Sequence, residues 1–112
     1  MATIEKKVVK ESFAIKFIAH ENGTPIGRAF LYVLYNDLHE EPFGFLEDVF
    51  VDKESRGRGI GRALVEAAID EAKKEKCYKL ICTSRHTKEE LHSWYEKVGF
   101  KNHGNEFRLD FN

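Results

Sequence analysis

Several features that would place a chain in a special class are scarce or missing here. The 112 residues contain two cysteines, two prolines and one methionine. Every apolar run falls far short of the roughly 20 residues that a membrane-spanning helix needs, and no apolar signal region is found at the N-terminus. The formal net charge of −1 gives no overall field that would attract nucleic acid. We therefore expect no membrane and no nucleic-acid partner.

The cysteines predict neither a disulfide nor a metal site. Cys77 and Cys82 lie in or near one expected strand, five residues apart, so their side chains should point to opposite faces. Two cysteines and scattered histidines also lack the spacing of a metal-ligand set. We expect both to be reduced thiols of a cytoplasmic protein.

The composition indicates a single ordered domain that spans residues 1–112. Apolar residues make up 42% of the chain and charged residues 33%, which is typical of a globular protein rather than a disordered one. Alternating or continuous apolar runs predict five strands, at residues 13–19, 26–35, 45–51, 78–83 and 106–111. The first two strands flank Asn22-Gly23, the strongest short signal for a hairpin.

Two amphipathic runs predict helices. The first extends from Ile60 to about Lys76, with a buried stripe of Leu64, Val65, Ala68, Ile69 and Ala72. The second follows a capping box, Thr87 to Glu90, and should end at Gly99; its apolar stripe is Leu91, Trp94, Tyr95 and Val98. Because the long helix connects the strands at 45–51 and 78–83, we expect these strands to be parallel neighbours in a mixed α/β fold.

The most informative segment is Arg56 to Gly61, which reads Arg-Gly-Arg-Gly-Ile-Gly between a strand and a helix start. Backbone N–H groups and the helix dipole form an anion site at such a junction. Arg62 stands where the dinucleotide fingerprint needs a glycine, and Gly61 is not followed by the Lys-Ser/Thr of a nucleoside-triphosphate loop. Both common nucleotide motifs therefore fail.

The spacing Arg56, Gly59, Gly61 fits Arg/Gln-x-x-Gly-x-Gly/Ala, and residues 94–100 read Trp-Tyr-Glu-Lys-Val-Gly-Phe. Together these motifs resemble the acyl-CoA loop and the Phe-Tyr-Glu-Lys-x-Gly-Phe signature of the GNAT N-acetyltransferase superfamily. The resemblance covers about residues 45–111. It implies a mostly antiparallel sheet with one parallel, splayed strand pair, two main helices, and acetyl-CoA as the donor.

Two departures from the family pattern stand out. Relatives usually carry two helices between their first and second strands, and only a dozen residues precede Phe13. We expect a short form that lacks both helices, with an acceptor side that is shorter, more open or completed by another protomer in a homodimer. Many relatives also have an asparagine that contacts the CoA arm, where this chain has Lys88.

The resemblance assigns donor binding to two adjoining segments. The loop amides would bind the CoA diphosphate, with charge added by three arginines; these residues are Arg56, Gly57, Arg58, Gly59, Ile60, Gly61 and Arg62. The pantetheine arm would pair like an added strand along Val49, Phe50 and Val51. A backbone N–H of Val49 or Phe50 would meet the acetyl oxygen. Some of the arginines could instead be ordinary solvated side chains.

Tyr95 matches the family tyrosine that protonates the departing thiolate, and a core aromatic on the helix stripe is the alternative interpretation of this residue. An amine acceptor must lose its proton before it attacks, so a base is needed. Glu47 is the first candidate, on the strand face expected to carry Val49 and Val51, and Asp48, pointing the other way, is the second. Both could instead be polar residues hydrogen-bonded at a sheet edge.

The sequence thus predicts an N-acetyltransferase that acts on a primary amine of a small molecule or a protein. The alternative is a non-catalytic acyl-CoA binder that serves as a sensor or an interaction module. His86 and His92 are further candidates for the acceptor side, with solvated histidines as the simpler interpretation.

Overall fold

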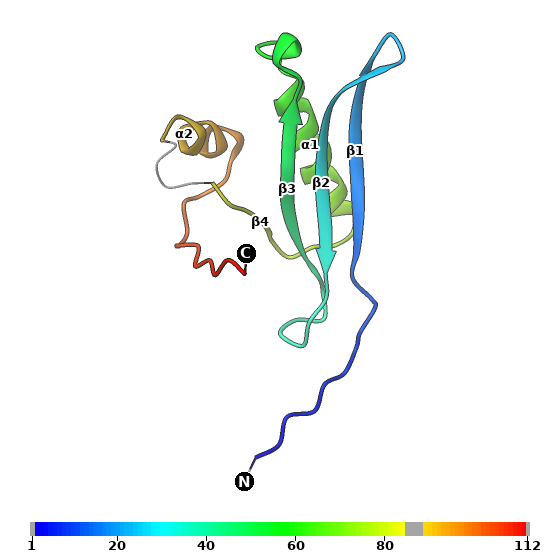
Figure 1. Ribbon diagram of the computed structural model, residues 1–112, viewed down its shortest axis with the longest axis vertical. Helices are drawn as coiled ribbons and strands as arrows, with labels where there is room; N and C mark the ends of the chain where they lie inside the picture. Colours follow the sequence, from blue (N-terminus) through cyan, green and yellow to red (C-terminus); the bar gives the residue numbers. More distant parts are fainter. Residues whose placement is uncertain (1, 85–88, 112) are drawn as a thin grey trace. The chain divides into compact units, whose positions relative to one another are not determined.

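The computed structural model describes residues 2–84 and 89–111 (Figure 1). Its elements follow in the order β1 (Phe13–Glu21), β2 (Thr24–Leu34), β3 (Phe43–Val51), a short 3-10 turn η1 (Lys53–Ser55), α1 (Ile60–Lys74), β4 (Leu80–Cys82) and α2 (Glu89–Val98). The four strands form one sheet in the order β1-β2-β3-β4, with β3 and β4 parallel. Residue contacts group the chain into two units, residues 1–81 and 82–112.

The β1–β2 hairpin turns where the sequence predicts it. Asn22 and Gly23 both have positive φ angles, +50° and +80°, which the tight turns of hairpins require. Glu21 pairs with Thr24 across the turn, and the ladder continues to Phe13 and Val33. β1 is the first strand in the sheet order, so its outer side is a sheet edge.

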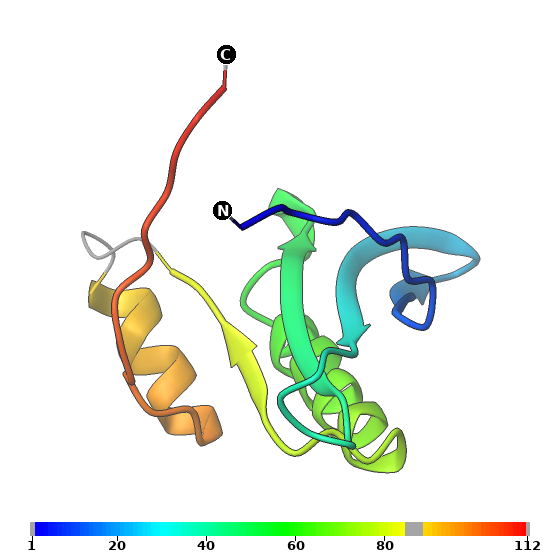
Figure 2. The same cartoon turned by 90° about the horizontal axis from the view of Figure 1, so that it is seen from below.

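The core of the first unit lies between one face of β1–β3 and α1, which crosses that face (Figure 2). Alternate residues of β2 point into it, and the buried apolar set is Ala29, Leu31, Val33, Leu46, Leu64, Val65, Ala68 and Ala72. Four of the five residues expected on the helix stripe are fully buried, and Ile69 is half-buried. The helical period of apolar residues therefore identified the packed face of α1.

The connection from α1 to β4 confirms the predicted crossover. Lys76, with φ +64°, ends the helix in the left-handed conformation, and the Cys77 N–H donates to the Ala72 carbonyl at 2.9 Å. The Gly44 N–H then donates to the Lys79 carbonyl at 2.9 Å. A Cβ on Gly44 would lie 2.8 Å from Leu80 Cδ1, so a larger residue here would have to displace that leucine side chain. β4 has three residues, fewer than the six predicted for residues 78–83.

In the second unit, α2 ends as predicted. Gly99 has a φ of +121°, and the Phe100 N–H donates to the Tyr95 carbonyl at 3.1 Å. The Tyr95 ring meets Trp94 and Phe100 edge to face, with centroids 5.1 and 5.6 Å apart. The predicted cap Thr87, together with His86 and Lys88, lies outside the described residues.

The strand predicted for residues 106–111 is wrong in this structure. Residues 100–111 contain neither strand nor helix, and the alternating Phe107, Leu109 and Phe111 are 93%, 76% and 91% exposed. Alternation alone does not make a strand, because a strand also needs a neighbour to accept and donate its backbone hydrogen bonds. Residues 2–12 are likewise without helix or strand, and Ile4 is 98% exposed.

Candidate functional site

A glycine loop links β3 to α1 through η1. Gly57 and Gly59 have φ angles of +80° and +82°, and Gly59 is the N-cap of α1. The cap residue supplies no side-chain hydrogen bond, so the first N–H groups of the helix have no partner from a cap side chain. A Cβ on Gly57 or Gly59 would meet no atom within 4 Å. The loop therefore combines exposed backbone donors with free space beside them, which is how proteins cradle phosphate groups.

The three arginines predicted to add charge to the loop each have a partner within the protein. Arg56 Nε donates to the Val51 carbonyl at 2.9 Å, Arg58 Nη1 lies 2.8 Å from Glu21 Oε2, and Arg62 Nε lies 2.7 Å from Glu66 Oε1. The hydrogen bond from Arg58 lowers the pKa of Glu21 below its usual range. The charges of Arg58 and Arg62 are thus partly balanced by carboxylates, whereas Arg56 donates to a neutral carbonyl.

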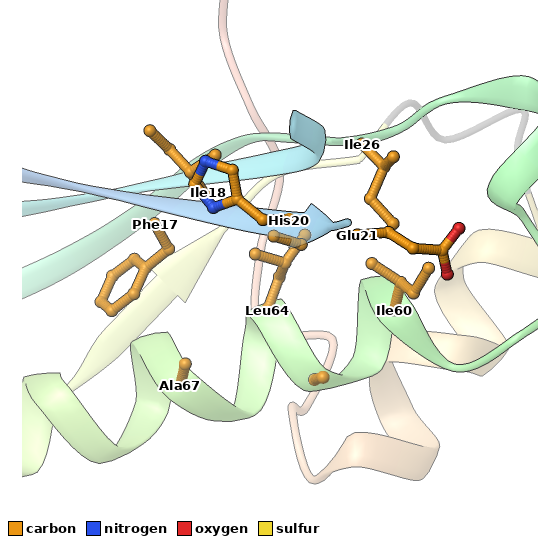
Figure 3. A pocket seen from close by; sticks show the side chains of 10 residues that line it. Phe17, Ile18, His20, Glu21, Ile26, Ile60, Leu64 and Ala67 are labelled. Atoms are coloured by element: carbon orange, nitrogen blue, oxygen red, sulfur yellow. The ribbon is translucent and has the colours of Figure 1, made fainter. Parts of the chain in front are cut away.

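The Glu21–Arg58 pair ties the tip of the β1–β2 hairpin to the loop, beside a hollow of about 330 Å³ (Figure 3). The hollow lies between the end of β1 and the first turns of α1, and it is lined mainly by apolar side chains that include Phe17, Ile60 and Leu64. Its apolar lining distinguishes it from the polar loop, so we do not assign the diphosphate to it.

A β-bulge interrupts β3 at Asp48 and Val49, where the segment predicted to hold the pantetheine arm begins. Arg28 pairs with Phe50 and Phe30 pairs with Glu47, so two residues of β3 face one residue of β2. Asp48, the first residue of the bulge, has a φ of +53°. A bulge leaves its extra residue out of the ladder and re-aims the neighbouring groups. One signal of the bulge is visible in the sequence, a pair of acidic residues within an apolar strand.

The predicted side-chain direction of Glu47 in β3 is wrong, because the bulge adds a residue to the strand. Alternation predicts that Glu47 shares a face with Val51, but Glu47 pairs with Phe30 while Val51 pairs with Gly27. Gly27 faces α1, since a Cβ there would lie 3.2 Å from a Leu64 methyl group, so Glu47 lies on the opposite face from Val51. The extra residue reverses the alternation, and Glu47 is exposed on the face away from α1.

The second base candidate, Asp48, is engaged by an arginine that sequence reasoning missed. Arg28 Nε and Nη2 donate to the two carboxylate oxygens of Asp48 at 2.8 and 3.1 Å. These hydrogen bonds lower the pKa of Asp48. The Arg28 guanidinium also lies 4.8 Å from the centre of the Phe50 ring, and that of Arg56 lies 5.4 Å from it. An acid of lowered pKa that already accepts two hydrogen bonds is a poor proton acceptor.

Tyr95 belongs to the second unit, where it is half-buried on α2. Burial raises the pKa of its phenol, and the neighbouring Cys82 thiol adds to this rise. Burial likewise raises the pKa of Cys82, to about 11. Both groups are therefore protonated at neutral pH, and the phenol is able to donate a proton.

The described part of the chain contains neither a membrane-spanning helix nor a metal-binding group of side chains. None of its helices has the length and apolar character needed to cross a membrane, and none of its acidic, cysteine and histidine side chains form a group able to hold a metal ion. Cys77 and Cys82 are free thiols.

Comparison with known proteins identifies the family. Residues 4–100 match the model of the Acetyltransferase (GNAT) family, so the chain belongs to that family. The sheet order, the parallel β3–β4 pair and the two helices are those of the GNAT fold, which confirms the predicted fold class.

Two solved structures resemble this chain over 88% of its length. One is a putative acetyltransferase from Agrobacterium tumefaciens, with a TM-score of 0.83, 32% identity and 69% of that chain covered. The other is the glucosamine-6-phosphate N-acetyltransferase of Arabidopsis thaliana, with a TM-score of 0.80, 25% identity and 67% covered. The likeness therefore extends over most of the chain.

In sequence, the chain is 40% identical over 67 residues to a glucosamine 6-phosphate N-acetyltransferase of Trypanosoma brucei brucei. That match covers 60% of this chain and 44% of the relative. The chain thus spans less than half the length of this curated relative.

Proposed function

We propose that this chain is an acetyl-CoA-dependent N-acetyltransferase that transfers an acetyl group to a primary amine by direct attack in a ternary complex. GNAT enzymes use acetyl-CoA. The observation that carries the proposal is the uncapped start of α1, which follows two left-handed glycines beside open space. In this proposal residues 1–112 act as one catalytic domain in the cytoplasm.

The donor would lie along the loop and the end of β3. The backbone N–H groups from Gly57 to Gly61 would bind the diphosphate, helped by the positive end of the α1 dipole. Arg56, Arg58 and Arg62 would supply further charge from the loop and the first turn of α1. The amides of pantetheine would pair with the backbone of residues 49–51, at the part of β3 that begins within the bulge.

Transfer requires that the amine nitrogen forms a bond to the thioester carbon while the carbon–sulfur bond breaks. A backbone N–H of Val49 or Phe50 would stabilise the negative charge on the acetyl oxygen. Glu47, exposed and on the face away from α1, would take the amine proton directly or through water. Tyr95, whose pKa is raised by burial, would give its proton to the departing thiolate.

Glucosamine 6-phosphate is the first acceptor to test, because several curated relatives are named as N-acetyltransferases of this sugar phosphate. Other small-molecule amines and protein amines are acceptor classes of equal chemical merit. A second protomer in a homodimer would add surface to the acceptor side. The alternative function is a non-catalytic acyl-CoA sensor or interaction module.

Two measurements separate these functions. Acetyl-CoA at 100 times its dissociation constant should stabilise the protein by about 2.7 kcal/mol through mass action, which a thermal unfolding assay detects. Release of free CoA thiol in the presence of an amine panel, glucosamine 6-phosphate included, then distinguishes an enzyme from a binder.

Gly59→Glu is the matched control for the donor site. Its carboxylate would enter the space beside the loop and repel the diphosphate, so it should abolish the thermal shift. Binding without thiol release for any amine would favour the sensor, and the absence of any shift at millimolar acetyl-CoA would refute the donor site.

A further inference from the structure

A strained residue lies in the interior of β3. Asp48 has a φ of +53°, in the left-handed region that side chains other than those of asparagine and aspartate seldom adopt. Its position at the start of the bulge sets the direction of the next two residues, Val49 and Phe50. Backbone strain of this kind persists only where surrounding contacts hold it in place.

The contact that holds Asp48 comes from the neighbouring strand. Arg28, in β2, grips both carboxylate oxygens of Asp48 at 2.8 and 3.1 Å. Arg28 pairs in the ladder with Phe50, which follows the bulge in β3. Its guanidinium therefore extends back past Val49 to reach the Asp48 carboxylate. A bidentate pair fixes the planes of both groups and therefore the rotamer of the aspartate. The pair is partly exposed, at 41% and 48% for the two side chains.

We propose that Arg28 is a positioning residue, which acts through Asp48 to hold the β3 bulge in the conformation that aims a backbone N–H of Val49 or Phe50 at the acetyl oxygen. This inference rests on the proposed acetyltransferase function. Asp48 is then a structural partner of Arg28 and not the base, which leaves Glu47 as the acidic residue of β3 available for that role.

The two parts of the donor site should respond differently to loss of Arg28. The diphosphate loop lies beyond η1 and is held by contacts that do not involve Arg28, namely Arg56 to Val51 and Arg58 to Glu21. Binding of acetyl-CoA should therefore persist when Arg28 is replaced. Stabilisation of the acetyl oxygen should weaken, because the bulge then samples other conformations.

A double-mutant cycle tests this. Arg28→Gln should lower kcat about fivefold, within the range of coupling between residues of one hydrogen-bond network, and leave the KM for acetyl-CoA unchanged. Asp48→Gly supplies a residue that adopts a positive φ without help, so adding Arg28→Gln to it should lower kcat no further. Arg108→Gln is the matched control, since it removes another exposed arginine–aspartate pair and should leave kcat unchanged.

Each outcome decides the matter. An unchanged kcat in Arg28→Gln overturns the proposal, and so does an equal fall of kcat in both backgrounds, which would mean that Arg28 acts through the Phe50 ring. If the unmodified protein transfers no acetyl group, the proposed function fails. The hold of the Arg28–Asp48 pair on the bulge is then tested alone by amide hydrogen exchange. Exchange at residues 48–50 should then be faster in Arg28→Gln than in the unmodified protein. Equal rates would refute the proposal that Arg28 holds the bulge through Asp48.

Discussion

The glycine loop makes a quantitative prediction through two neighbouring glycines that differ in backbone conformation. Gly59 has a φ of +82° and open space where a Cβ would lie, whereas a Cβ on Gly61 would meet Val51 Cγ2 at 3.7 Å, an ordinary contact. Gly61 is the second residue of α1 and its φ is not in the left-handed region. The same substitution, glycine to alanine, should therefore have opposite effects on stability at the two positions.

The magnitudes follow from known backbone preferences. The left-handed conformation costs an alanine about 1–2 kcal/mol. Alanine also lowers the conformational entropy of the unfolded chain, which raises the free energy of unfolding by about 0.4–1 kcal/mol. Gly59→Ala should therefore lower the free energy of unfolding by about 1 kcal/mol, or the melting temperature by about 4 °C. Gly61→Ala should raise that free energy by about 0.5–1 kcal/mol, because alanine is the better helix former.

Urea unfolding followed by circular dichroism measures both changes in one experiment. Gly59→Ala should also weaken acetyl-CoA binding, since its methyl group enters the space beside the loop. The left-handed conformation of Gly59 would be refuted if Gly59→Ala were as stable as the unmodified protein. It would also be refuted if Gly61→Ala lost as much stability as Gly59→Ala.

Three further predictions concern ionisable groups. Tyr95→Phe should lower kcat and leave acetyl-CoA affinity nearly unchanged in thiol-release and titration assays, whereas an equal kcat would reject its role as the acid. Cys82, with a pKa of about 11, should react with iodoacetamide at pH 7.5 far more slowly than a free cysteine, as mapped by mass spectrometry; rapid alkylation would contradict its burial. The Arg58 partner lowers the pKa of Glu21 below 4.5, so the stability from this pair should be present above pH 4.5 and be lost as the pH falls through the lowered value. Glu21→Gln should remove this acid-side dependence, and an unchanged profile of stability against pH would show that the pair contributes nothing.

Some features of the fold were predictable because their causes are local in the chain. Asn22-Gly23 turns the hairpin through its own positive φ angles, and the buried stripe of α1 follows from helical spacing. Gly99 ends α2 for the same kind of reason. The glycine loop before α1 belongs with these, since its conformation depends on residues within one turn of each other.

Other features were decided only by contacts between distant residues. The strand expected at residues 106–111 is absent, because alternation cannot supply the neighbouring strand that its backbone needs. The partner of Arg58 could not be predicted either, because Glu21 lies in a hairpin 37 positions away. Surface ion pairs depend on which side chains the fold brings within reach, and the sequence carries no pattern for that.

The sequence by itself determined the family, the order of the main elements and the position of the glycine loop before α1, since motif spacing and local backbone preferences are properties of short segments. The tertiary structure decided which face of the sheet carries Glu47 and which acidic residue is held by Arg28. The physical reason is the bulge at Asp48: one extra residue in β3 reverses the alternation of side chains, and only the pairing with β2 reveals where that residue is inserted.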